Sequence, residues 1–347
     1  PGPGGLSGAP VQGMAPAPEG GVTVRCYAAP MEGLTGAVFR RVHHRFFPGV
    51  DKYFMPFLSP GKEHHFQKRD LRELAPEQNA GLHAVPQLLT RSPEDFLWCA
   101  HALADLGYQE VNLNLGCPSG TVTAKGKGSG LLRDLGELER FLDDVFAGAE
   151  VAVSVKTRIG WRDPAEFGPL LALLSRYPMA ELTVHPRVRE EFYRGGAHLE
   201  TFQQAVEIWR GPLCYNGDLT APGEVSALTE RFPGLEALMA GRGLAGDPAL
   251  FRKVQGGPAA GRQELRDYHQ ALYEGYAEAF QNRRAAMMRM KELWSYLIFL
   301  FDGGERHAKA LRKANDPAAF LDAAAAIFRD LPLREDSAGG WRDRPLF

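Results

Sequence analysis

Eight short apolar runs, separated by longer stretches with helix character, constrain the fold of this 347-residue chain more than any other feature. Parallel strands need a crossover of about a dozen residues or more, usually a helix, so this alternation is typical of βα units. The runs cover residues 22–29, 52–57, 84–89, 110–115, 151–158, 182–185, 212–216 and 238–241. The chain is therefore expected to form a parallel sheet with helical crossovers.

Helix-start signals support that alternation. Residues 92–95 (Ser-Pro-Glu-Asp) offer an N-cap, a proline at the first helical position and acidic residues in the first turn. Asp-Pro pairs at 163–164 and 247–248 begin later segments in the same way. Eight strand–helix units in about 230 residues match a closed parallel (β/α)8 TIM barrel, which we predict here. A doubly wound open sheet is the alternative, but eight regularly spaced units fit closure better.

The carboxyl ends of the predicted strands carry mostly polar residues. In a (β/α)8 barrel these ends meet at one rim, where the active site lies. A single polar residue at a strand end is usually a turn former, but so many at one rim predict a binding site. The candidates are Pro30, Met31, Glu32, Gln87, Asn114, Cys117, Lys156, Arg158, His185, Arg187, Asn216, Gly217, Asp218, Gly241 and Arg242.

The stretch 110–119 places a thiol at one of these ends. Its apolar residues alternate with Asn112 and Asn114, which predicts a strand with one polar face that delivers Cys117 to the following loop. The alternative is that Cys117 is a small buried hydrophobic residue, like most free cysteines. Gly116 and Pro118 leave little apolar side chain around it, so we favour a thiol that belongs to a functional site.

Composition excludes several other classes of function. The formal net charge of −2 gives no sign of general nucleic-acid affinity, so DNA is not expected and any RNA must be held by a local patch. The four cysteines lie far apart without a C-x-x-C pair, so neither a metal site nor a redox dithiol is indicated. With no signal peptide and no apolar stretch of about 20 residues, we expect a cytoplasmic protein without a membrane span.

Composition also suggests the domain boundaries. Residues 1–21 are rich in Gly, Pro and Ala, which predicts a disordered tail. The barrel is expected to span residues 22–254, followed by a linker at 255–261 and a helical domain at 262–347. Apolar residues recur at helical spacing over 265–280 and 287–297, and two more helices are expected from about 304 to 314 and after Asp316-Pro317.

Basic residues on these helices have two interpretations. They could form an RNA-facing surface, or they could be the solvated faces of ordinary helices. The residues are Arg283, Arg284, Arg289, Lys291, Lys309, Arg312 and Lys313.

Two glycine-rich stretches need interpretation. Residues 241–246 fit G-x-G-x-x-G, but they close the last βα unit and contain Arg242 where a Rossmann turn has a small residue. A mononucleotide phosphate site is the better interpretation, which favours FMN over NAD. Residues 125–130 (Lys-Gly-Lys-Gly-Ser-Gly) lack Walker spacing. We expect them to form a flexible basic loop beside Cys117 that can close over a substrate or contact an RNA phosphate.

Taken together, these motifs resemble the tRNA-dihydrouridine synthase family. The resemblance rests on residues 29–33, 114–119, 153–158, 185, 216–218 and 241–243, in this order, and runs from about residue 24 to 251. The helical region also resembles that family's RNA-binding domain. The resemblance implies an FMN enzyme that reduces uridine to 5,6-dihydrouridine in tRNA. Hydride would pass from reduced FMN to C6, Cys117 would give a proton to C5, and NADPH would reduce the flavin again.

The resemblance also assigns roles to the rim residues. FMN would be bound by Pro30, Met31, Glu32, Gln87, Lys156, His185, Asn216, Gly217, Asp218, Gly241 and Arg242. Asn114, Lys125, Arg158 and Arg187 are the candidate substrate-binding residues. One departure is Pro186, where the family usually has glycine, because proline removes a backbone N–H and fixes φ.

Other functions remain as alternatives to this one. They are a flavin reductase of ribosomal RNA or of a free pyrimidine, and an RNA-binding barrel without chemistry. The thiol at position 117 favours an enzyme, and the helical appendage favours RNA over a free base. A monomer is expected.

Overall fold

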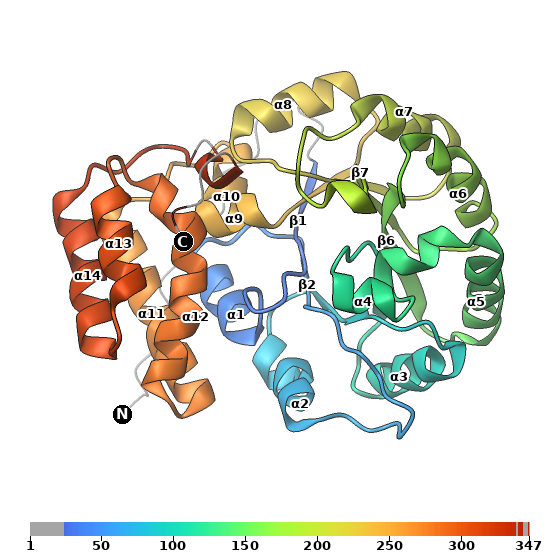
Figure 1. Cartoon of the computed structure of the whole chain (residues 1–347), viewed down its shortest axis with the longest axis horizontal. Helices are drawn as coiled ribbons and strands as arrows, with labels where there is room; N and C mark the ends of the chain where they lie inside the picture. The colour runs from blue at the N-terminus through green and yellow to red at the C-terminus, as the bar shows by residue number, and fades with distance from the viewer. Residues whose placement is uncertain (1–23, 338, 343–345, 347) are drawn as a thin grey trace, which may run out of the picture.

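The computed structural model describes residues 24–337, 339–342 and 346. The tail expected at residues 1–21 lies outside the described residues. Figure 1 looks onto a ring of strands and helices, with the orange and red C-terminal helices packed against its left side. Among the described residues, no helix combines the length and the apolar character that crossing a bilayer requires.

In the described part of the chain, nine parallel strands form one sheet that closes on itself. In order of hydrogen-bonded neighbours it runs β3-β2-β1-β9-β8-β7-β6-β5-β4. The strands are β1 (Arg25–Ala28), β2 (Lys52–Phe54), β3 (Ala84–Val85), β4 (Gln87–Leu88), β5 (Glu110–Leu115), β6 (Ala152–Gly160), β7 (Leu182–Val188), β8 (Leu213–Asn216) and β9 (Ala237–Ala240). The end members β3 and β4 are consecutive in the chain, so the barrel is complete and the (β/α)8 prediction is confirmed.

Pro86 divides the third predicted run, residues 84–89, into two short strands. Proline has no backbone N–H to donate, so the hydrogen-bond ladder is interrupted at this residue. Its carbonyl still accepts a hydrogen bond from the Asn112 N–H (2.8 Å), which keeps the segment joined to β5. The single strand expected here is therefore present as two halves.

Helices connect the strands and cover the outside of the barrel (Figure 1). They are α1 (Ala37–Phe46), α2 (Lys68–Leu74), α3 (Pro93–Asp105), α4 (Gly120–Ala124), α5 (Leu135–Gly148), α6 (Phe167–Leu174), α7 (Leu199–Ile208), α8 (Pro222–Arg231), α9 (Arg242–Gly246) and α10 (Leu250–Val254). As predicted, Ser92 caps α3, and Asp163 caps the 3-10 turn Pro164–Glu166 that leads into α6. Asp247 accepts the N–H of Ala249, just before α10.

The two faces of β5 have different surroundings. Val111, Leu113 and Leu115 are fully buried in the same apolar cluster as Phe96 of α3 and Leu142 of α5. Because side chains alternate along a strand, the intervening asparagines point into the barrel. The predicted division of β5 into an apolar and a polar face is confirmed.

In the part of the chain that the structure describes, four α-helices follow the barrel and share a core with it. They are α11 (Arg262–Phe280), α12 (Arg283–Leu297), α13 (Glu305–Lys313) and α14 (Pro317–Asp330), in agreement with the helical segments predicted from the sequence. Phe39 of α1 is buried in the same cluster as Leu272 and Tyr276 of α11. Gly275 permits this close packing, because a Cβ there would lie 2.7 Å from Val38 Cγ1. The helical region is therefore fixed beside the segment that follows β1.

Candidate functional site

A cavity of about 250 Å³ opens at the carboxyl ends of the barrel strands. Most of the residues predicted from the strand ends line it. They are Pro30, Met31, Glu32, Gln87, Asn114, Cys117, Lys156, Arg158, His185, Asn216, Gly217, Asp218, Gly241 and Arg242. The structure does not bring Lys125 or Arg187 to this lining. Closure of the barrel thus gathers residues that are up to about two hundred positions apart in the sequence.

Two aromatic residues that the sequence analysis missed also line the cavity. Phe57 lies just after β2, and Tyr193 lies on the loop that follows β7. Tyr193 is 50% exposed, and its ring lies 4.5 Å from the Arg242 guanidinium carbon and 5.3 Å from that of Arg158. The only sequence signal for it was an aromatic pair just before Gly195 in a loop at the predicted rim.

The loop that carries Cys117 is held by hydrogen bonds to its backbone. The Asn114 side-chain oxygen accepts from the N–H groups of Gly116 (3.0 Å) and Cys117 (2.9 Å), as in an Asx turn. The Cys117 carbonyl accepts from the Ser129 N–H (3.1 Å) and hydroxyl (2.8 Å). These bonds fix the direction in which the thiol leaves the backbone.

The glycine-rich segment 125–130 is not the flexible loop that we expected. It leads into the 3-10 helix Gly128–Arg133, whose first residues are buried under the Cys117 loop. Gly128 has a positive φ (57°), and a Cβ there would lie 2.9 Å from the Cys117 carbonyl oxygen. Lys125 is exposed, and its carbonyl accepts from the Arg91 guanidinium (3.4 Å). The segment therefore packs against the backbone of the loop that carries Cys117, which we call the thiol loop. Glycine at position 128 makes this contact possible, because it permits backbone conformations and close contacts that other residues do not.

A chain of hydrogen bonds runs along the barrel interior to this loop. The Asn114 amide donates to Gln87 (3.0 Å), the Gln87 amide to Asn112 (2.9 Å), and the Asn112 amide to Ser154 (2.9 Å). The Ser154 hydroxyl in turn donates to Glu110 (2.7 Å). Buried polar side chains that are fully paired hold one another in place, so Gln87 and Asn114 are rigid walls of the cavity.

Lys156 and His185 bring a charged and a neutral group to the same cavity. Burial, with Arg158 nearby, lowers the pKa of Lys156 to about 8, and Lys156 donates no hydrogen bond to any residue that the structure describes. Burial and the neighbouring cations lower the pKa of His185 well below its usual value, so its ring is neutral at pH 7. Its Nε2 lies 2.9 Å from an Arg187 N–H and must accept it, which places the ring proton on Nδ1. A half-buried ammonium in a cavity wall, without a partner among the described residues, indicates a site for an anionic or hydrogen-bond-accepting ligand.

The arginines at this rim differ in their partners. The Arg158 guanidinium donates to the carbonyls of Gly116 (3.0 Å) and Phe192 (2.6 Å), so it joins the loops after β5 and β7. Arg187 is buried and donates to Asp218 (2.9 Å) and to the Gly195 carbonyl (2.7 Å), which gives it a structural role. Because these partners hold the Arg187 guanidinium, it does not line the cavity.

Glycines allow the backbone to approach closely at the far side of the cavity. A Cβ at Gly241 would lie 2.8 Å from the Met31 sulfur, and one at Gly217 would lie 2.5 Å from the Tyr215 hydroxyl. Next to them, the Arg242 guanidinium donates to Asp218 Oδ1 through Nη2 (2.6 Å) and Nε (3.2 Å). The cavity therefore has a wall of bare backbone with a guanidinium group beside it.

The Cys117 thiol lies in the cavity wall and keeps its proton at neutral pH. Burial raises its pKa, and this effect outweighs the opposing influence of a backbone hydrogen bond at Ser119 and of the Lys156 charge. The other three cysteines are fully buried, and burial raises the pKa of both Cys26 and Cys99 to about 12. Only Cys117, among the cysteines, can act on a bound molecule.

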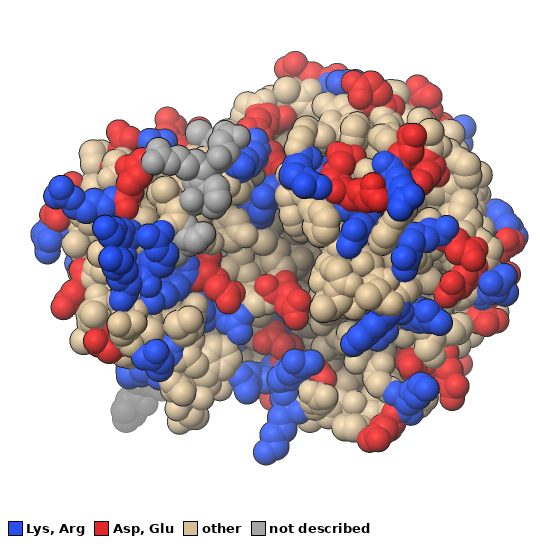
Figure 2. Space-filling view, in the orientation of Figure 1, with Lys and Arg blue, Asp and Glu red and all other residues tan. Residues whose placement is uncertain are grey.

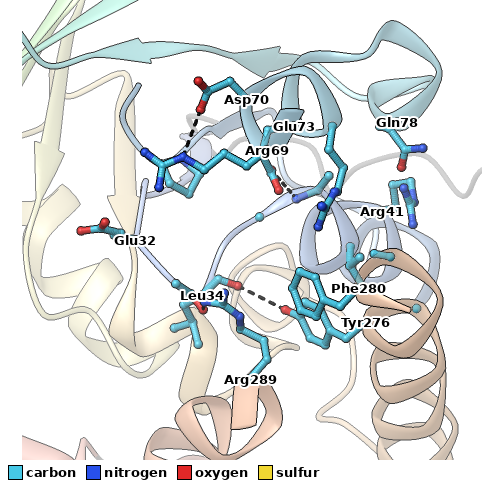
Figure 3. Close-up of a pocket in the computed structure, with 18 of the residues that line it drawn as sticks. Glu32, Leu34, Arg41, Arg69, Asp70, Glu73, Gln78, Tyr276, Phe280 and Arg289 are labelled. Atoms are coloured by element: carbon cyan, nitrogen blue, oxygen red, sulfur yellow. Dashed lines mark hydrogen bonds and ion pairs between the residues drawn. The ribbon is translucent and has the colours of Figure 1, made fainter. Parts of the chain in front are cut away.

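A larger groove of about 740 Å³ adjoins this cavity, and Glu32 and Phe57 line both. The groove lies between α1 and α2 on one side and α11 and α12 on the other. In Figure 3, Arg41 and Arg69 lie on its barrel side, and Phe280 and Arg289 on its helical side. Figure 2 shows a hollow between the helical region and the barrel, with lysines and arginines on both sides. A long ligand could lie in the groove while one end enters the cavity.

Comparison with known proteins gives consistent matches. A family model described as dihydrouridine synthase (Dus) matches residues 27–327. The tRNA-dihydrouridine synthase B of Pasteurella multocida is 30% identical over 232 residues, which cover 67% of this chain and 69% of that protein. A probable tRNA-dihydrouridine synthase of Rickettsia bellii is 26% identical over 88% of this chain and 95% of its own length. Among solved structures, an old yellow enzyme homologue from Zymomonas mobilis has a TM-score of 0.49 at 13% identity, over 68% of this chain and 90% of that chain.

Proposed function

This chain belongs to the dihydrouridine synthase family, and we propose that it reduces uridine to 5,6-dihydrouridine in tRNA with bound FMN as the redox cofactor and NADPH as the reductant. The observation that carries the proposal is the cavity itself, where the Cys117 thiol and a Lys156 ammonium without a partner among the described residues lie in the lining with the other predicted residues. The relatives named above supply the substrate class, and the cavity supplies groups that suit it.

The cavity residues fit a flavin mononucleotide. Lys156 has no partner among the described residues and can meet the negative charge of a reduced flavin ring, which a fixed ammonium stabilises. The bare backbone at Gly217 and Gly241, with Arg242 beside it, suits a phosphate group. Bound FMN would supply the hydride for the reaction.

Cys117 is proposed to supply the proton. Reduction at C6 of uracil leaves negative charge at C5, and this carbon must gain a proton before the product leaves. A general acid must hold its proton until that moment, and the raised pKa of the Cys117 thiol meets this condition. Asn114 fixes the loop on which the thiol lies, so the proton is delivered from one side of the cavity.

The groove is proposed to bind the RNA next to the reacting base. A base in folded RNA must leave its stack to enter a cavity of this size, and the flanking nucleotides must be held meanwhile. Two guanidinium groups lie near the Phe280 ring, with Arg72 at 5.4 Å and Arg289 at 5.7 Å from its centroid. Guanidinium groups beside an aromatic face suit phosphates and unstacked bases.

The test is a reconstituted reaction. The purified chain is incubated with FMN, NADPH and a tRNA transcript, and dihydrouridine is mapped by mass spectrometry; parallel reactions contain an rRNA fragment or free uridine. Dihydrouridine in the tRNA alone is the expected result. Product only from rRNA or from free uridine would identify one of the alternative substrates, and no product from any of them would contradict the proposed activity.

A further inference from the structure

The end of the described chain returns from the helical region to the barrel. We call residues 333–342, without 338, the C-terminal strap. Leu333 forms an antiparallel bridge with Phe301, and the buried Lys253 ammonium of α10 donates to the Glu335 carbonyl (2.7 Å) and pairs with Asp336. In Figure 1 the strap ends in a short dark-red helix beside α9 and α10. The strap is thus fastened to both parts of the molecule.

Trp341 packs the strap against α9, the helix that begins with Arg242. Its side chain is buried against Tyr296 (5.9 Å between ring centroids) and Phe299 (6.5 Å). Its ring also covers Gly246, the last residue of α9, where a Cβ would lie 2.6 Å from a carbon of the indole. A side chain at Gly246 would displace the tryptophan, so this glycine and the strap fit each other.

The next residue, Arg342, reaches the acidic group of the candidate site. Its guanidinium donates to the Asp218 carbonyl, and its Nε lies 3.9 Å from Asp218 Oδ2. Arg187 and Arg242 pair with the same carboxylate, at 2.9 Å and 2.6 Å. Three guanidinium groups therefore surround Asp218, and the only other acidic partner of Arg342 among the described residues is Glu224, at 3.7 Å. Two carboxylates leave one of the three positive charges uncompensated.

We propose that Arg342 is a positioning residue for the phosphate end of the bound cofactor. It lies near Asp218 Oδ2, the oxygen that Arg187 pairs with, while Arg242 pairs with Oδ1. It thereby adds positive charge beside Arg242, on the side where the phosphate would lie. This inference rests on the proposed function, because it takes FMN as the ligand. It extends the site to a segment about a hundred residues beyond the last strand of the barrel.

Flavin binding tests the inference without any turnover. The full-length apoprotein is titrated with FMN and with riboflavin, which lacks the phosphate, and flavin fluorescence is followed. For Arg342→Ala we expect the FMN dissociation constant to rise about fivefold and the riboflavin constant to stay the same. Arg342→Lys keeps a charge and should recover part of the FMN affinity. Arg334→Ala is the matched control, because Arg334 lies on the same strap but pairs with Asp302 (2.7 Å).

The outcomes separate the inference from the proposed function. Unchanged FMN affinity in Arg342→Ala would overturn the inference, and so would an equal loss for FMN and riboflavin, which would show that the strap only stabilises the fold. If the alanine variant fails to fold, Arg342→Gln is titrated instead, with the same expectations. If the unaltered chain bound neither flavin, the proposed cofactor would be wrong, whatever the variants do.

Discussion

Cys117, on the loop after β5, and Lys156, on the neighbouring strand β6, line one cavity, and burial changes the acidity of both side chains. Burial disfavours the charged form of each group, so it raises the pKa of the thiol and lowers that of the ammonium. The thiol therefore stays protonated at pH 7, while the Lys156 ammonium, with a pKa of about 8, is still mostly charged there. Both conditions suit an acid that acts beside an anionic ligand.

The Lys156 pKa predicts how FMN binding depends on pH. The free protein loses the Lys156 charge as the pH rises through about 8, and a flavin ring atom that accepts a hydrogen bond from the ammonium favours the charged form. The FMN dissociation constant should therefore be constant below this pH and rise by up to about tenfold per unit above it. Fluorescence titrations between about pH 6.5 and 9.5 measure this. Lys156→Met is the control, and its FMN dissociation constant should be higher than that of the unaltered chain and independent of pH. A dissociation constant of the unaltered chain that did not change with pH would show that Lys156 does not bind the flavin.

At the scale of elements, alternation and capping residues predicted the strands and helices because they act within a few residues of sequence. The assignments that failed depended on distant partners. Residues 125–130 were expected to be a flexible loop, since nothing in their composition indicates that Ser129 hydrogen-bonds the Cys117 carbonyl. The sequence predicts Arg187 at the cavity, but its guanidinium is bound to Asp218 and to the Gly195 carbonyl and does not line the cavity. Tyr193 reaches the cavity only through the path of its loop.

The support beneath the thiol loop gives a prediction for Gly128. An alanine there would be strained by the positive φ (57°) and would press on the Cys117 carbonyl at 2.9 Å. We expect Gly128→Ala to lower the free energy of unfolding by about 1–3 kcal/mol and to slow dihydrouridine formation. Gly120→Ala is the control, because no atom lies within 4 Å of the added Cβ. Denaturant unfolding and turnover are measured for both; equal behaviour of the two variants would contradict the supporting role of this segment.

At the scale of the whole molecule, a chain with a formal net charge of −2 must hold RNA through local charge. The groove offers arginines from both the barrel and the helical region, and α13 exposes Lys309 and Lys313. The shared core of α1 and α11 joins the two parts, so removing the helices would expose apolar surface of the barrel. Surface substitutions are therefore a cleaner test of RNA binding than truncation.

Salt dependence is the measurable consequence of such binding. Lysines and arginines at phosphates release counterions, so tRNA affinity should fall steeply with salt. Lys309→Glu with Lys313→Glu should weaken tRNA binding and reduce the slope of log K against log salt by roughly one to two, with FMN affinity unchanged. Arg140→Glu with Arg176→Glu, on the barrel side away from the helices, is the control. A tRNA affinity that did not depend on salt would show that the RNA is not held by electrostatic contacts to its phosphates.

The most direct test of the account is the Cys117→Ala variant, with flavin reduction and dihydrouridine formation measured on the same preparation. The alanine leaves the Asn114 and Ser129 hydrogen bonds to the backbone intact, so only the proton donor is lost. We predict that the variant binds FMN, accepts electrons from NADPH and forms dihydrouridine at least about a hundredfold more slowly. Alanine at the buried Cys26, Cys99 or Cys214 should leave the rate per folded protein near that of the unaltered chain. Normal dihydrouridine formation by Cys117→Ala would mean that the proton comes from another group, and would contradict the central claim.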